Sequence, residues 1–123
     1  MKPNFIDVKK NNKVALRNFT EPNDKHDVIK TLLVRMLRRK HKDNTMVPIY
    51  TEYDPLKPNE DYPDVWMRVK DDIYVYEIQS DMNKRWIQRI QEQYEEVNLI
   101  IINMNKISNN IDKMREQLED FIY

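Results

Sequence analysis

Three oxygen-bearing side chains interrupt two apolar runs in the middle of the sequence. Asp64 lies in the first run, residues 62–69, and Glu77 and Gln79 close the second, residues 73–80. Both runs are rich in β-branched and aromatic residues, and the short acidic stretch between them predicts a β-hairpin. Carboxylate and amide oxygens that meet at a strand end suit a hard cation such as Mg²⁺ or Mn²⁺. Zinc and iron are not favoured, because the chain has no cysteine and its two histidines lie far from these runs.

The pairing register decides which of these side chains meet. Side chains alternate along a strand, so Glu77 and Gln79 point to one face, which the neighbouring apolar residues predict to be partly interior. A two-residue turn at residues 71–72 would place Asp64 opposite Gln79. Trp66 would then lie opposite Glu77, and Asp64 and Glu77 would be diagonal neighbours. A carboxylate on such a face needs a compensating partner, and a bound cation is one.

The residues of this hairpin resemble a family of nucleases. A Pro-Asp at the start of one strand, followed about a dozen residues later by Glu-x-Gln, is similar to the motif of the PD-(D/E)xK nuclease superfamily. The similarity is closest to its competence CoiA-like branch, covers roughly residues 24 to 104, and rests on short motifs that occur in the same order. These are His26, Glu52, Asp64-Val65, Glu77-Ile78-Gln79-Ser80, Arg89, Tyr94 and Leu99-Ile100-Ile101-Ile102.

This resemblance implies a fold, an activity and a set of site residues. The fold would be α/β, with a restriction-endonuclease-like core in which helices flank a mixed β-sheet. The activity would be metal-dependent hydrolysis of DNA phosphodiester bonds by an endo- or exodeoxyribonuclease. The residues expected to hold Mg²⁺ or Mn²⁺ are Asp64, Glu77 and the carbonyl of Ile78, and those expected to complete the catalytic set are Gln79, Glu52 and His26.

Gln79 departs from the superfamily, which usually has a lysine at this position. An amide can orient water or bind a metal but cannot supply charge, so Lys84, Arg89 or His26 would have to compensate. Two other interpretations stay open. One is a catalytically inactive nuclease-fold protein that binds nucleic acid or assembles with partners. The other is an unrelated small α/β interaction protein, in which the three polar side chains of the hairpin would not converge.

Two elements before the hairpin are predicted to border the site. Residues 24–42 carry apolar side chains at helical spacing, and His26 lies at the edge of that stripe, where a surface or capping histidine is the alternative. Residues 46–53 read as a strand, on which Glu52 is more often a surface residue when taken alone. The basic end of the helix is either solvated or a contact to DNA phosphates, and its members include Arg38 and Arg39.

Three elements are predicted after the hairpin. A helix over residues 81–96 precedes a nearly continuous apolar run, residues 97–104, which suits a fully buried parallel strand. A last helix over residues 108–122 closes the core or supplies a dimer contact. Residues 1–20 form either short strands or an arm. The polar face of the first of these helices is either solvated or positions a phosphate, through Lys84, Arg85 and Arg89.

Composition sets the remaining expectations. The 123 residues carry no net charge and no cysteine, which predicts a single soluble, intracellular (cytoplasmic) domain. No apolar run approaches the roughly 20 residues needed to span a bilayer, so no membrane is expected as a partner. DNA is the expected partner, and a homodimer is a hypothesis because cutting both strands usually requires two sites. The chain has no glycine, so asparagine and aspartate are expected at left-handed turn positions.

Overall fold

The computed structural model describes residues 21–123, and the arm or strands predicted for residues 1–20 lie outside this part of the chain. The described residues form an α/β fold with a four-stranded mixed sheet and three α-helices. The expected order of helix, three strands, helix, strand and C-terminal helix is confirmed. The elements are α2 (Glu21–Lys40), β1 (Ile49–Thr51), β2 (Val65–Val69), β3 (Asp72–Gln79), α3 (Lys84–Gln93), β4 (Asn98–Asn103), α4 (Ile111–Leu118) and the short 3-10 turns η1 (Met104–Lys106) and η2 (Glu119–Phe121).

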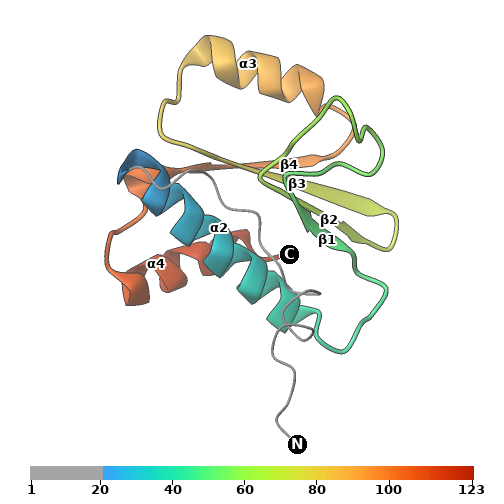
Figure 1. Cartoon of the computed structure of the whole chain (residues 1–123), viewed down its shortest axis with the longest axis horizontal. Coiled ribbons are helices and arrows are strands. Elements are labelled where there is room, and N and C mark those ends of the chain that lie inside the picture. The colour runs from blue at the N-terminus through green and yellow to red at the C-terminus, as the bar shows by residue number, and fades with distance from the viewer. Residues whose placement is uncertain (1–20) are drawn as a thin grey trace, which may run out of the picture.

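The sheet is covered on both faces. Its strands have the order β1-β2-β3-β4, with antiparallel pairing from β1 to β3 and parallel pairing between β3 and β4. The helices α2 and α4 lie on one face, and α3 lies on the other as the crossover that parallel strands require (Figure 1). Within residues 21–123, no helix combines the length and the apolar character needed to cross a membrane.

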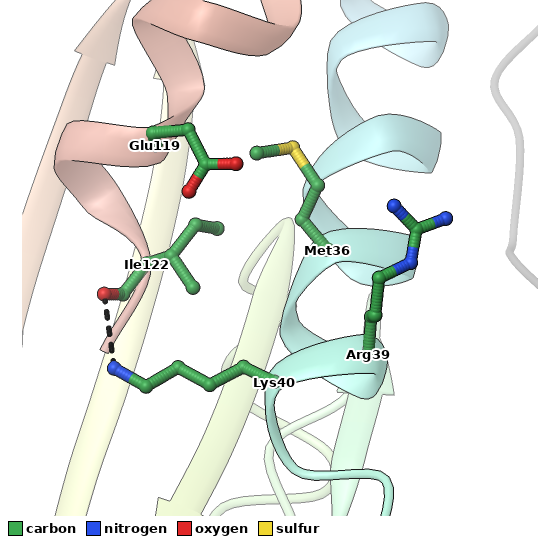
Figure 2. A pocket seen from close by; sticks show the side chains of 5 residues that line it. All are labelled: Met36, Arg39, Lys40, Glu119 and Ile122. Carbon is green, nitrogen blue, oxygen red and sulfur yellow. Dashed lines mark hydrogen bonds between the residues drawn. The ribbon is translucent and has the colours of Figure 1, made fainter.

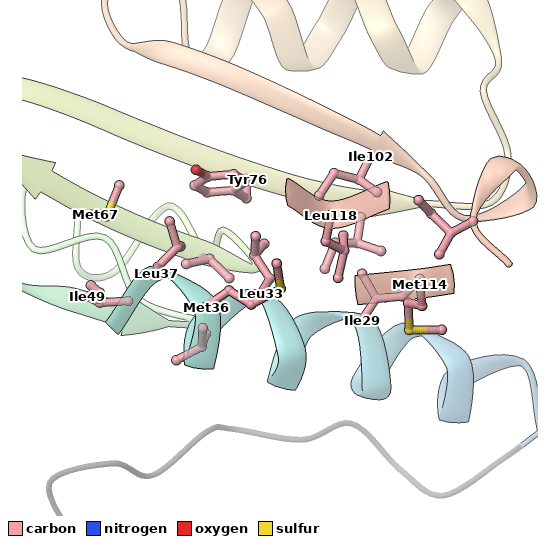
Figure 3. Close-up of a cluster of buried hydrophobic side chains, with 14 of the residues drawn as sticks. Ile29, Leu33, Met36, Leu37, Ile49, Met67, Tyr76, Ile102, Met114 and Leu118 are labelled. Carbon is pink, nitrogen blue, oxygen red and sulfur yellow. The ribbon is translucent and has the colours of Figure 1, made fainter. Parts of the chain in front are cut away.

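The larger part of the core lies between α2, α4 and the sheet (Figure 3). The helical spacing of Ile29, Leu33 and Leu37 puts these side chains on one side of α2, where each is fully buried. Because side chains alternate along β2, Val65 and Met67 lie on the same face of the sheet and pack in the same cluster. A smaller cluster fills the opposite face, where Trp66, Val75, Ile90 and Tyr94 pack under α3.

The predicted hairpin exists, but its turn lies one residue earlier than expected. Val69 pairs with Asp72, so residues 70–71 form the turn rather than residues 71–72. Trp66 therefore lies opposite Val75 and not opposite Glu77 as predicted. The register changes by two residues, which leaves every side chain on the face that alternation assigned to it.

Several predicted boundaries were wrong. β1 is much shorter than the strand predicted over residues 46–53, and α3 begins later than residue 81, because the Asn83 carboxamide caps it by accepting from the amides of Arg85 and Trp86. β4 lies at an edge of the sheet that residues 21–123 form, so Ile102 is its one fully buried residue. The prediction of a fully buried strand failed because apolar sequence does not reveal the position of a strand in the sheet.

The left-handed positions are not the expected ones. Among the described residues, Glu52 and Lys70 have positive φ angles of 54° and 57°. Lys70 occupies the first position of the hairpin turn, where a positive φ matches the twist of the flanking strands. Glu52 follows the last residue of β1, and a left-handed conformation costs a residue with a Cβ about 1–2 kcal/mol. This strain lies beside the candidate site.

Candidate functional site

Asp64 lies at the centre of the site, immediately before the first residue of β2. Its side chain is 1% exposed, and its Oδ2 accepts a 2.7 Å hydrogen bond from the backbone amide of Ile78 on β3. Its Oδ1 lies 3.0 Å from Nε2 of His26. The carboxylate thus joins the start of β2, strand β3 and helix α2 at one buried point.

His26 is a buried member of α2 and not a surface or capping residue. Its side chain is 3% exposed, and its Nδ1 lies 3.4 Å from Oδ1 of Asp27. Its Nε2 is at ion-pair distance from Asp64, but the direction of approach is not that of a hydrogen bond. The imidazole therefore lies between the carboxylates of Asp27 and Asp64, inside the fold.

A second buried contact between a cation and an acid lies one helical turn along α2. Lys30 is completely buried, and its Nζ donates to Oε1 of Glu52 over 3.1 Å. Glu52 is placed opposite Asp64 by continuing the pairing of Thr51 with Val65, and its amide donates to the carbonyl of Pro63 over 2.9 Å. Two acids at the ends of neighbouring strands thus lie beside two nitrogen-bearing side chains of α2, His26 and Lys30.

Lys30 is the site residue that the sequence did not identify. The signal for it was present, since Lys30 lies four residues after His26 and directly follows Ile29 in the apolar stripe of the helix. A lysine at such a position is usually expected to direct its ammonium group into water. Only the tertiary structure shows that the group stays inside.

Glu77 approaches Asp64 from β3. Continuing the register one step beyond the pairing of Val65 with Tyr76 places Glu77 directly opposite Asp64, where a diagonal neighbour was predicted. Glu77 is half-buried. Burial raises the pKa of Tyr94 on the adjoining face, and the negative charges of nearby acids raise this pKa further; the acids are Glu77, Asp61, Asp54 and Asp64. The same region therefore carries a concentration of negative charge.

The remaining hairpin residues take distinct positions. Gln79 is half-buried and pairs with Asn103 of β4, so it is two residues beyond Glu77 rather than opposite Asp64 as predicted. Ile78 donates its amide to Asp64, which fixes its peptide group beside the site. Of the five predicted catalytic residues, His26 and Asp64 are in contact. Glu52 and Glu77 lie opposite Asp64 when the strand registers are continued, and Gln79 lies farthest along its strand.

The predicted nucleic-acid contacts separate into two groups. Lys84, Arg85 and Arg89 are exposed on α3. Arg38 is half-buried and donates from Nη2 to the carbonyl of Ile49 over 3.4 Å, which is a structural contact within the fold. Arg39 is exposed and lines a pocket with Lys40 between the end of α2 and the C-terminal residues (Figure 2).

The oxygen atoms of the site match part of the ligand set that a divalent metal uses in proteins. Within residues 21–123, no group of three or more His, Cys, Asp and Glu side chains is arranged to hold a metal ion. Mg²⁺ commonly uses only one or two carboxylates and takes its other ligands from water and phosphate. Asp64 and Glu77, together with a backbone carbonyl such as that of Ile78, carry hard oxygen donors of this kind. The residues therefore fit Mg²⁺ or Mn²⁺ as partial ligands.

No family model, curated protein or solved structure matches this chain. The assignment of a function consequently rests on the geometry of the site.

Proposed function

We propose that this protein is a metal-dependent nuclease of the PD-(D/E)xK type, with a restriction-endonuclease-like core, that hydrolyses DNA phosphodiester bonds. The observation that carries the proposal is the buried position of Asp64 at the start of β2, between His26 and the Ile78 amide, with Glu77 opposite on β3. Burying a carboxylate is costly, and a bound cation beside Asp64 and the opposite acid would offset that cost, which supports the proposal.

The roles follow from the contacts. Asp64 and Glu77 would hold Mg²⁺ or Mn²⁺, which lowers the pKa of a bound water and neutralises charge on the phosphate. The Ile78 amide fixes the orientation of the Asp64 carboxylate through its hydrogen bond. Nε2 of His26 lies 3.0 Å from Oδ1 of Asp64, so the imidazole would help to hold this carboxylate in place. Lys84, Arg85 and Arg89 on the exposed surface of α3 would contact the DNA backbone.

The direct test is cleavage of labelled single-stranded, duplex and branched DNA with Mg²⁺ or Mn²⁺. We expect the wild type to cut and both Asp64→Asn and Glu77→Gln to lose at least about 10²-fold in single-turnover rate, because each loses a ligand charge. Asp120→Asn is the matched control, since this acid is exposed on η2. Equal cleavage by all four proteins would identify a contaminant and contradict the proposal.

A second candidate function is nucleic-acid binding without turnover. Two observations favour it: both oxygens of Asp64 already have neighbours within the chain, and Gln79 replaces the charged residue usual in the superfamily. A binding protein of this kind would retain DNA after removal of metal with a chelator, and Asp64→Asn would bind as the wild type does. Filter binding with and without the chelator separates the two functions.

A further inference from the structure

Lys30 is an unusual residue for the interior of a small domain. Its side chain is 0% exposed and lies among the apolar residues that pack α2 against the sheet. An ammonium group removed from water loses several kcal/mol of solvation, and one ion pair rarely restores more than this. A methionine or leucine would fill the same space without that cost. Stability alone therefore does not explain a lysine here.

The acid that pairs with Lys30 is held in a strained position. Glu52 has a φ of 54°, and its side chain is 30% exposed while Lys30 is fully enclosed. Outliers of this kind persist where the surrounding structure fixes them, and they concentrate at functional sites. The strain places the Glu52 carboxylate at the end of β1, opposite Asp64, with one side toward Lys30 and one toward solvent.

The position of the lysine relative to the proposed metal ligands is set by α2. His26 and Lys30 are four residues apart, and His26 contacts Asp64 while Lys30 contacts Glu52. Residues at this spacing lie on the same side of a helix, about one turn apart. The Lys30 ammonium therefore lies on the same side of α2 as the contact between His26 and Asp64, and because it is fully buried, water screens its charge less than that of a surface lysine.

We propose that Lys30 is a positioning residue of the nuclease site and supplies, from helix α2 through Glu52, the positive charge that Gln79 does not carry. This inference rests on the proposed function. Lys30 opposes negative charge that develops on the phosphate and holds the Glu52 carboxylate in place, while it disfavours a cation bound by Asp64 and Glu77. The charge of Lys30 therefore lowers the affinity for the metal but raises the rate of cleavage.

The test uses Lys30→Met, which keeps most of the volume and removes the charge. We expect Mn²⁺, followed by calorimetry, to bind this variant about threefold to tenfold more tightly, because a positive charge near the cation is removed. At saturating Mn²⁺, single-turnover cleavage should fall by about 10²-fold. Lys40→Met, at the exposed end of the same helix, is the matched control and should change neither quantity. Lys30→Arg should retain much of the wild-type cleavage.

A purely structural lysine would behave differently. Its loss would weaken Mn²⁺ binding and cleavage together, and Lys30→Met in a Glu52→Gln background would change neither quantity. Either that result or wild-type cleavage by Lys30→Met overturns the inference. If Lys30→Met does not fold, the double variant Lys30→Met/Glu52→Gln is compared with Glu52→Gln alone: slower cleavage by the double variant supports the inference, and equal cleavage overturns it. If the wild type neither binds Mn²⁺ nor cuts, the proposed function fails and the inference fails with it.

Discussion

The first half of α2 buries polar side chains beside the apolar Ile29, whereas the second half buries only apolar side chains. In the first half, His26, Asp27 and Lys30 are all buried polar residues. In the second half, the buried residues are apolar, and the basic side chains at its end, such as Arg39 and Lys40, are exposed. One helix therefore combines an interior where charge is enclosed with an ordinary amphipathic segment.

The difference shows which part of α2 lowers the stability of the fold, since burying polar groups costs free energy. The second half follows the pattern that stabilises any surface helix, with apolar residues inside and cations near the C-terminus, where the helix dipole favours them. The first half departs from it at the point where the ends of β1, β2 and β3 meet. Buried polar residues at one end of a helix, beside strained backbone, are the departure from local rules that we expect under the proposed function.

The largest effect on stability is expected in the apolar half. Leu37→Ala should lower the free energy of unfolding by about 2–5 kcal/mol, because Leu37 is fully buried and its removal leaves a cavity. Arg39→Ala, exposed on the same half, should change it by less than about 0.5 kcal/mol. Urea unfolding followed by far-UV circular dichroism measures both. A Leu37→Ala protein as stable as the wild type would contradict the division of α2 into two halves.

A smaller effect is expected from His26 in the polar half. His26→Ala should cost about 1–3 kcal/mol, since it removes the imidazole that lies beside Oδ1 of the buried Asp64 carboxylate. In an Asp64→Asn background the same substitution should cost less, because a neutral amide then replaces the buried carboxylate beside His26. The double-mutant cycle in urea isolates this coupling. Strictly additive losses would show that the 3.0 Å contact contributes nothing.

The smallest effect on stability is expected at alkaline pH from two buried tyrosines. Tyr76 lies on the α2 face of the sheet and Tyr94 on the α3 face. Burial raises the pKa of Tyr76, which packs against α2, and of Tyr94, which also lies near the acids of the site. Above about pH 10 the unfolded tyrosines ionise while the folded ones keep their protons, so the folded protein loses stability as the pH rises. Each contributes at most about 1.4 kcal/mol per pH unit to this loss.

Tyr94→Phe and Tyr76→Phe should each flatten that alkaline loss of stability, as measured by urea midpoints between about pH 9 and pH 11. Added salt should reduce the contribution of Tyr94 more than that of Tyr76, because acid charges raise the pKa of Tyr94 and salt screens them. An equal response of the two variants to salt would show that the acids do not act as a group.

Much of the fold could be predicted because it depends on local periodicity. The spacing of Ile29, Leu33 and Leu37 identified α2, and alternation assigned Asp64 and Glu77 to one face even though the predicted turn was wrong by one residue. A shift of two in the register leaves faces unchanged, so this error did not separate the proposed ligands. The boundaries of β1 and the edge position of β4 depend on partner strands and could not be read from the sequence.

The sequence by itself determined the order of elements and the hairpin, and it predicted which acids lie near the open end of that hairpin. The tertiary structure alone decided that the Lys30 ammonium is enclosed, that Glu52 takes a left-handed conformation, and that His26 is held beside Asp64. The physical reason is that periodicity fixes which side of a helix or strand a residue occupies. The long side chain of a lysine can still reach either water or the interior, and only the packing around it settles which.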